Sequence, residues 1–124
     1  MVQRYSSRIY PPAPFLTVRV SASADSQAIN VPALLDTGAD YTAVPDYVPE
    51  YLKLEELDSE FTRGVIGRAT YEPVFRAFVY IDDYPPHEVK ASSLSIPYAV
   101  LGRDVLNQYH ITLDGPNQSL TITR

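Results

Sequence analysis

Ala33-Leu34-Leu35-Asp36-Thr37-Gly38-Ala39-Asp40 is the stretch around which this 124-residue sequence is organised. Apolar residues run directly into a carboxylate, a hydroxyl and a glycine, so a buried strand is predicted to end by presenting Asp36. Its neighbours Leu35, Thr37 and Gly38 would desolvate the carboxylate, which makes Asp36 a candidate acid or base. Gly38 allows a tight turn, and its amide can donate a hydrogen bond to the carboxylate. An ordinary β-turn is the alternative, and Asp-Thr-Gly alone leaves the two interpretations evenly balanced.

Composition and charge exclude several classes of function. The net charge is −5 and no cluster of Lys and Arg is present, which argues against a nucleic-acid partner. The absence of Cys excludes disulfides, thiolate metal sites and Cys nucleophiles. No apolar stretch is long enough to cross a membrane, and the first 14 residues lack the apolar centre of a signal peptide. We therefore expect one domain, no membrane association and a cytoplasmic location.

The residue bias favours a mainly all-β fold with one or two short helices. With 11 Pro and 10 Tyr but only 5 Gly, the sequence suits short strands and irregular links better than long helices. The few glycines fall where backbone freedom is expected to be needed, such as Gly102 before a short helix.

The first third of the chain predicts an arm followed by a hairpin. Residues 1–14 form a polar, Pro-rich arm that is either disordered or adds an edge strand to a partner, and residues 15–124 form the domain. Apolar residues alternate from Phe15 to Val20, which is typical of a half-buried strand. A turn precedes the returning strand from Ala28 to Leu35, in which Pro32 implies an edge or a bulge.

The middle of the chain alternates loops with short elements. We predict a loop over residues 45–50 and a short helix over residues 51–57. Two strand pieces, residues 61–63 and 69–71, flank residues 64–67 as a hairpin tip.

The last part of the chain predicts strands, a helix and a final hairpin. A strand covers residues 74–81 and is bounded by Pro73, and a loop follows over residues 83–88. Another strand, residues 94–101, is interrupted at Pro97. A short helix is predicted for residues 103–109, and residues 111–113 and 120–122 pair across the Asp-Gly-Pro-Asn turn.

Other chemistries are poorly supported by the sequence. His87 and His110 are the only histidines. His87 near Asp83 and Glu88 resembles a loose metal site, but a solvated acidic loop is the favoured interpretation. No nucleophile-elbow pattern and no phosphate-binding glycine loop occurs. We expect neither a metal nor another cofactor.

Four segments, taken in order, carry a resemblance to a known family. They are LLDTGAD at 34–40, RGVIG at 63–67, a long apolar strand at 74–81 and AVLGRDVL at 99–106. This order resembles the retropepsin-like aspartic proteases over roughly residues 15–122. The resemblance implies a closed barrel-like β fold with a flap hairpin, an obligate homodimer and a peptide or protein substrate.

The resemblance also implies roles for individual residues. Asp36 would be the catalytic aspartate, one from each subunit, while Thr37 would brace the two motifs and Gly38 would place its amide near the carboxylates. Arg103 would support the site by pairing with Asp40. The substrate-binding positions implied are Ala39, Asp40, Gly64, Val65, Ile66, Gly67, Tyr98 and Val100, of which Gly64 to Gly67 form the flap tip.

Three features depart from the retroviral pattern. Ala13 occupies the region where retroviral members carry an arginine that reaches the partner subunit. The chain continues past Leu113 into a full hairpin, and the flap has fewer glycines. The dimer is therefore expected to be built differently.

The leading hypothesis is an aspartic endopeptidase with a two-aspartate, water-activating site formed across a homodimer. The alternative is a catalytically weak or inactive module of the same fold that dimerises or binds peptides, because fold alone does not decide activity. A third possibility is a monomeric β-domain in which Asp-Thr-Gly is only a turn.

Overall fold

The computed structural model describes the main chain of residues 1–63 and 69–124 and the side chains of residues 1–57 and 73–124. The predicted flap tip, residues 64–67, lies outside the described main chain. In chain order, the elements are β1 Val2–Arg4, β2 Phe15–Ser21, β3 Ala28–Leu35, β4 Ala43–Pro45, α1 Tyr47–Leu52, β5 Glu56–Arg63, β6 Ala69–Tyr80, β7 His87–Leu94, β8 Ala99–Leu101, α2 Arg103–Leu106, β9 His110–Asp114 and β10 Ser119–Thr123.

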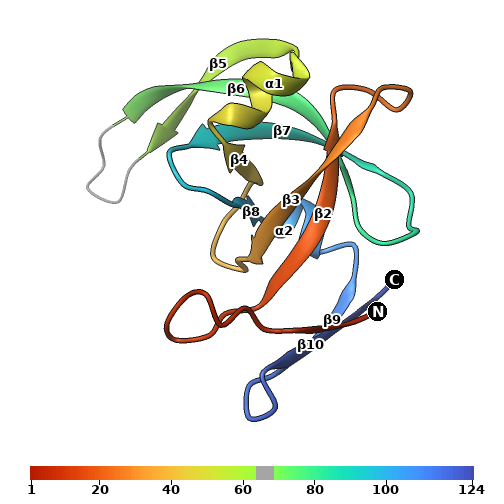
Figure 1. The fold of residues 1–124 in the computed structure, drawn as a ribbon. Coiled ribbons are helices and arrows are strands. Elements are labelled where there is room, and N and C mark those ends of the chain that lie inside the picture. Colours follow the sequence, from red (N-terminus) through yellow and green to blue (C-terminus); the bar gives the residue numbers. More distant parts are fainter. Residues whose placement is uncertain (64–68) are drawn as a thin grey trace.

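Most of the strands form a closed barrel. The larger sheet has the order β2-β3-β8-β4-β7-β6-β5, and a further pairing of β2 with β6 joins its two sides (Figure 1). That pairing closes six of the strands into a ring and leaves β5 outside it, paired only with β6 among the described strands. The predicted fold class, a mainly β barrel with two short helices, is confirmed.

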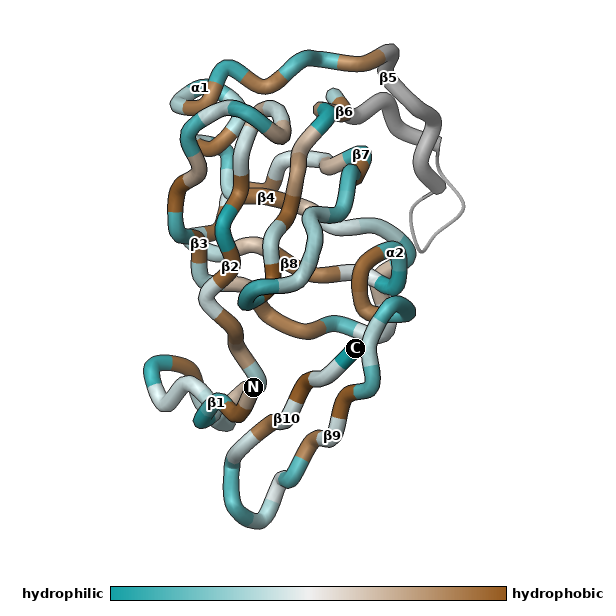
Figure 2. The backbone as a smooth tube through the Cα atoms, turned by 90° about the vertical axis from the view of Figure 1, so that its right-hand side faces the viewer, coloured by the Kyte–Doolittle hydropathy of each residue, from teal (hydrophilic) through white to brown (hydrophobic). Residues whose placement is uncertain are grey.

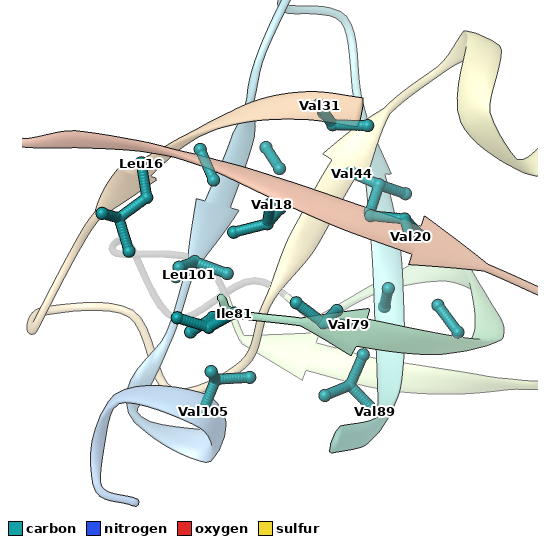
Figure 3. Packing of buried hydrophobic residues seen from close by; sticks show 14 of the residues in the cluster. Leu16, Val18, Val20, Val31, Val44, Val79, Ile81, Val89, Leu101 and Val105 are labelled. Atoms are coloured by element: carbon teal, nitrogen blue, oxygen red, sulfur yellow. The ribbon is translucent and has the colours of Figure 1, made fainter. Parts of the chain in front are cut away.

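Strand alternation fills the barrel with aliphatic side chains. Leu16, Val18 and Val20 of β2 are buried, while the residues between them, Thr17 and Arg19, are exposed. Figure 3 shows these side chains meeting Val31 of β3 and Leu101 of β8 in the interior. Because successive strand residues point to opposite faces, the even-numbered residues of β3 lie on the outside of the barrel.

Pro32 has no backbone N–H to donate, and it lies where β3 has no paired strand on one side. The amide of Leu35 bonds to the Pro14 carbonyl on the β2 side, so the amide position of Pro32, an odd number of residues away, faces the opposite side. On that side β3 pairs with β8 only from Ala33 to Leu35. The strand therefore loses no ladder hydrogen bond at Pro32.

The first helix lies earlier than predicted. The expected loop at residues 45–50 contains most of α1, and the expected helix at residues 51–57 contains only its end. Pro49 is tolerated because it stands in the first turn, where backbone amides need no intrahelical partner. Lys53, with φ of 54°, ends the helix in the left-handed conformation.

Three strand boundaries were also predicted wrongly. β5 begins at Glu56, inside the expected helix and before the expected strand piece at residues 61–63. β6 runs through Pro73, and its partner β5 shifts register between Leu57 and Glu60, opposite that proline. β7 begins at His87, inside the expected loop, and its inward side chains, Val89 and Ala91, are too few for a clear sequence pattern. The predicted interruption at Pro97 is confirmed and separates β7 from β8.

A smaller sheet, β1-β10-β9, lies beside the barrel (Figure 2). The predicted final hairpin is confirmed as β9 and β10. The N-terminal arm is not disordered: its strand β1 pairs with β10 of its own chain, a third arrangement beyond the two expected. The helix α2 is shorter than predicted. Neither described helix has the length and hydropathy to cross a membrane.

Candidate active site

β3 and β8 together deliver Asp36 to the end of the barrel. The amide of Asp36 donates to the carbonyl of Leu101, 3.0 Å away, which fastens the start of the turn to β8. The Ala39 amide donates to the Asp36 carbonyl at 3.2 Å and completes the turn. The Gly38 amide lies 2.9 Å from Asp36 Oδ1, so the hydrogen bond expected from the sequence is present.

The backbone position of Gly38 also leaves little room for a side chain. A Cβ atom at this position would lie 3.2 Å from Asp36 Oδ1, closer than ordinary van der Waals contact. A side chain here would therefore disturb the carboxylate that the Gly38 amide holds.

The environment of Asp36 is wetter than the sequence suggests. Asp36 is half-buried, and both Thr37 and Gly38 are exposed. The chain therefore shields the residue only in part, and fuller desolvation of the carboxylate must come from another surface laid over it.

Arg103, the first residue of α2, anchors the loop from the other side. Its Nη1 donates to the Thr37 carbonyl at 2.6 Å, and its Nη2 forms an ion pair with Asp40. Its backbone amide donates to the Ala39 carbonyl at 2.9 Å. Three separate contacts thus join the start of α2 to the loop that carries Asp36.

A polar network around the buried Thr42 lies behind this anchor, and no sequence pattern indicated it. The Thr42 hydroxyl donates to Asp104 Oδ1 at 2.8 Å and accepts from the Gly102 amide at 3.2 Å. The Thr42 amide donates to Asp104 Oδ2 at 3.0 Å. Because Thr42 and Asp104 are 62 positions apart in the sequence, only the paired strands bring them together.

Gly102 is needed for space and not for backbone freedom. Its backbone is extended, with φ of −87° and ψ of −178°, a conformation open to any residue. A Cβ atom would lie 2.6 Å from the carbonyl carbon of Tyr41. The expectation based on freedom was wrong here, and close backbone approach is the reason for glycine.

The predicted pocket residues lie on the same outer side of the barrel as Asp36. Tyr98 and Val100 are half-buried and alternate with the buried Ala99 and Leu101. The pairing of Leu34 with Val100 brings β8 alongside the end of β3. The flap-tip residues Gly64, Val65, Ile66 and Gly67 lie outside the described residues.

The residues around His87 form a hydrogen bond and surface ion pairs. His87 Nε2 lies 2.5 Å from the Tyr109 hydroxyl, and burial lowers the pKa of His87 below its usual value. Glu88 pairs with Arg76, which also pairs with Glu55. Among the described residues, His, Asp and Glu form no group of three suited to a metal ion.

Comparison with known proteins identifies relatives of this fold. EIAV protease, solved with the inhibitor HBY-793, is similar with a TM-score of 0.60 and 21% identity, covering 80% of this chain and 89% of that one. The protease of simian foamy virus (mac) has a TM-score of 0.57 and 15% identity, covering 76% and 92%. A retropepsin-like aspartic protease from Rickettsia conorii has a TM-score of 0.55 and 11% identity, covering 99% and 92%.

Sequence identities this low show only that the fold is shared. The comparison with curated proteins gives no match. The family model described as "Retroviral aspartyl protease" matches residues 11–114. Since this match spans most of its 124 residues, the chain belongs to the retroviral aspartyl protease family.

Proposed function

We propose that this protein is an aspartic endopeptidase that works as a homodimer, with Asp36 of each copy forming the catalytic pair. The observation that carries the proposal is the position of Asp36, on the outer side at the end of β3, with its carboxylate held by the Gly38 amide at 2.9 Å. One chain thereby supplies one oriented acid, which is half of the site that the chemistry needs.

Hydrolysis of a peptide bond by carboxyl groups requires two of them. One acts as a base toward water while the other donates a proton to the carbonyl oxygen of the substrate. Two carboxyl groups at close range cannot both ionise cheaply, so they share one proton, and the aspartic proteases as a class are the standard example of this effect. A two-fold axis beside Asp36 would bring the second carboxyl group into place.

The surroundings of Asp36 support a role that needs a precise geometry. The loop is fixed at one end by β8, through the Asp36 amide, and at the other by Arg103. Thr37 and Gly38 are exposed, so a second copy has access to this loop. A partner laid over the loop would also remove more water from the carboxylate than the single chain does, since Asp36 is only half-buried in it.

The other predicted residues are assigned roles around this pair. Ala39 and Asp40 would contact the main chain of an extended peptide, and Tyr98 and Val100 would shape its side-chain pockets. Residues 64–67 would close over the bound peptide as a flap. Arg103 would position the loop through the Thr37 carbonyl and Asp40, without acting on the substrate itself.

The first test is peptide cleavage between pH 4 and 7, with unstructured peptides as substrates. We expect Asp36→Asn to lower kcat/KM by about a hundredfold or more, because the asparagine neither gives nor accepts the required proton. Asp25→Asn is the matched control, since Asp25 is exposed in the turn between β2 and β3. Asp36→Asn should leave the molar mass of the assembly unchanged in sedimentation.

Two outcomes would contradict the proposal. If the wild-type protein binds peptides and cleaves none of them at any pH, the alternative of an inactive peptide-binding module is correct. If sedimentation detects only monomer at high concentration, the Asp-Thr-Gly motif is a turn in a monomeric β-domain.

A further inference from the structure

A groove of about 670 Å³ lies between the N-terminal arm and the edge of the barrel. Residues 3–6, 8 and 9 of the arm form one wall, and the opposite wall comes from β2, Pro32 of β3 and the segment before β8. Within this lining, Phe15 and Tyr98 meet edge to face, with ring centroids 5.0 Å apart. A volume of this size accommodates several peptide side chains.

The groove opens on the same face of the strands as Asp36. Along β3, Val31, Ala33 and Leu35 are buried, so Pro32 and Asp36 lie on the outer face. Tyr98 directly precedes β8, whose Ala99 pairs with Ala33, and it lines the groove together with Pro32. The candidate acid and the groove therefore belong to one continuous outer surface.

Strand geometry gives the separation between them. Pro32 precedes Asp36 by four residues, which is about 13 Å along a strand at roughly 3.3 Å per residue. A substrate in an extended conformation advances by the same amount per residue. A peptide lying parallel to β3 would thus reach the groove about four residues from the bond that is cut.

The charged residues that line the groove indicate which kind of substrate side chain it would bind. Arg4 and Arg8 line the groove, and no carboxylate does so among the described residues. Arg76 and Arg103 form ion pairs with carboxylates, and Arg19 lies over the Tyr80 ring. Within the described side chains, by contrast, Arg4 and Arg8 form no ion pair, although the chain carries a net charge of −5.

The arm wall is held in place by the rest of the protein. Arg4 pairs with Ser119 in the small sheet, and the Tyr5 amide donates to the Gln118 carbonyl at 2.8 Å. Ser6 and Ala13 exchange two backbone hydrogen bonds that close the loop between them. The two guanidinium groups are therefore carried by a segment anchored at both ends.

We propose that this groove is an outer substrate subsite that selects an acidic side chain about four residues from the scissile bond. The inference rests on the proposed protease function and adds a preference to it. Guanidinium groups bind carboxylates through charge-assisted hydrogen bonds, and the aromatic and proline residues beside them accept the apolar part of the chain.

The test compares peptides that carry Glu, Gln or Lys at each position from three to five residues on either side of the cut bond. We expect one position to prefer Glu over Gln by about five- to tenfold in kcat/KM. Arg4→Gln/Arg8→Gln should reduce that preference to nearly one, because glutamine carries no charge to attract the Glu side chain. Arg19→Gln/Arg124→Gln, which removes the same charge elsewhere, should retain the preference. Higher salt should weaken it.

The outcomes separate this inference from the proposed function. Equal cleavage of the Glu and Gln peptides, or a preference that survives Arg4→Gln/Arg8→Gln, would overturn the subsite and leave the protease intact. If nothing is cleaved, equilibrium binding of the same peptides decides: a Glu preference that depends on Arg4 and Arg8 supports the subsite without turnover, and no such preference refutes it. Loss of the dimer in Arg4→Gln/Arg8→Gln would instead make the groove a contact between copies.

Discussion

Asp36 depends on residues that lie far from it in the sequence. Arg103 bonds to the Thr37 carbonyl and pairs with Asp40, and Asp104 receives two hydrogen bonds from Thr42. Exposed ion pairs add little to stability, so the Arg103 contacts matter mainly because they fix the loop. Thr42 itself is buried, so each partner lost there would leave a polar group unsatisfied.

Replacement of Arg103 tests whether its contacts fix the catalytic loop and add little to the stability of the fold. Arg103→Gln should lower the free energy of unfolding by less than about 1 kcal/mol, since Arg103 and Asp40 are both substantially exposed. It should lower kcat/KM by roughly ten- to hundredfold, because the loop that carries Asp36 loses its anchor. Denaturant unfolding and peptide cleavage measure the two effects.

Arg76→Gln is the matched control, because it removes two surface ion pairs away from the loop. A similar loss of activity in both variants would mean that Arg103 does not position the site.

His87 gives the folded protein a dependence on pH. Burial and the nearby Arg124 lower its pKa in the folded state, although Asp104 opposes this shift. Above about pH 6.5 the ring is neutral in both states and does not affect stability. As the pH falls below about 6.5, the unfolded chain binds the proton more readily, so the free energy of unfolding decreases until the folded-state pKa is passed.

The expected result is a smaller loss of stability between about pH 7.5 and 5.5 in His87→Gln than in the wild type. Gln stays neutral and retains polar atoms to meet the Tyr109 hydroxyl. His110→Gln, at an exposed position of β9, serves as the control. Equal slopes for wild type and His87→Gln in denaturant titrations at several pH values would refute this.

At the scale of elements, the sequence predicts what short-range patterns encode. The alternation in β2 and the turn between β9 and β10 place those strands correctly, because each depends on neighbours in the chain. The position of α1 was wrong because the Pro49 signal resembles a loop, although a proline in the first turn is compatible with a helix. β7 has only two buried apolar residues at its centre, too few to predict a strand.

In the candidate site, too, some features follow from local sequence patterns and others do not. The Asp36 turn and its Gly38 hydrogen bond follow from a local motif, and the Arg103–Asp40 pair follows from a family resemblance. The Thr42–Asp104 network and the arm groove depend on strand register, which no local pattern contains. Ala39, Tyr98 and Val100 stay predictions as substrate contacts, and so does the domain boundary at residue 15.

At the scale of the whole molecule, the small sheet is the surface best suited to a second copy. Among the described strands, its edge strands β1 and β9 each have one unpaired side. Val2 and Leu113 on these strands are 72% and 50% exposed. Exposed apolar side chains on open strand edges favour association with another chain. The cytoplasmic location stays a prediction.

Leu113→Lys should therefore weaken the proposed homodimer. Burial of a half-exposed leucine is worth on the order of 1 kcal/mol, and an added charge opposes contact, so the dimer dissociation constant should rise about tenfold or more. Sedimentation equilibrium measures it. Tyr51→Lys is the control, since it places the same charge at an exposed aromatic position of α1, at the opposite end of the molecule (Figure 1). Equal effects of the two variants would exclude the small sheet as the interface.

The most direct test of the shared catalytic pair is a crystal structure of the assembled protein that locates the two Asp36 side chains. A proton-sharing pair requires a two-fold axis between them, so we expect carboxyl oxygens about 3 Å apart, the separation at which two carboxyl groups share one proton. An assembly that holds the two carboxyl groups far apart, with no channel for a peptide between them, would contradict the proposed site.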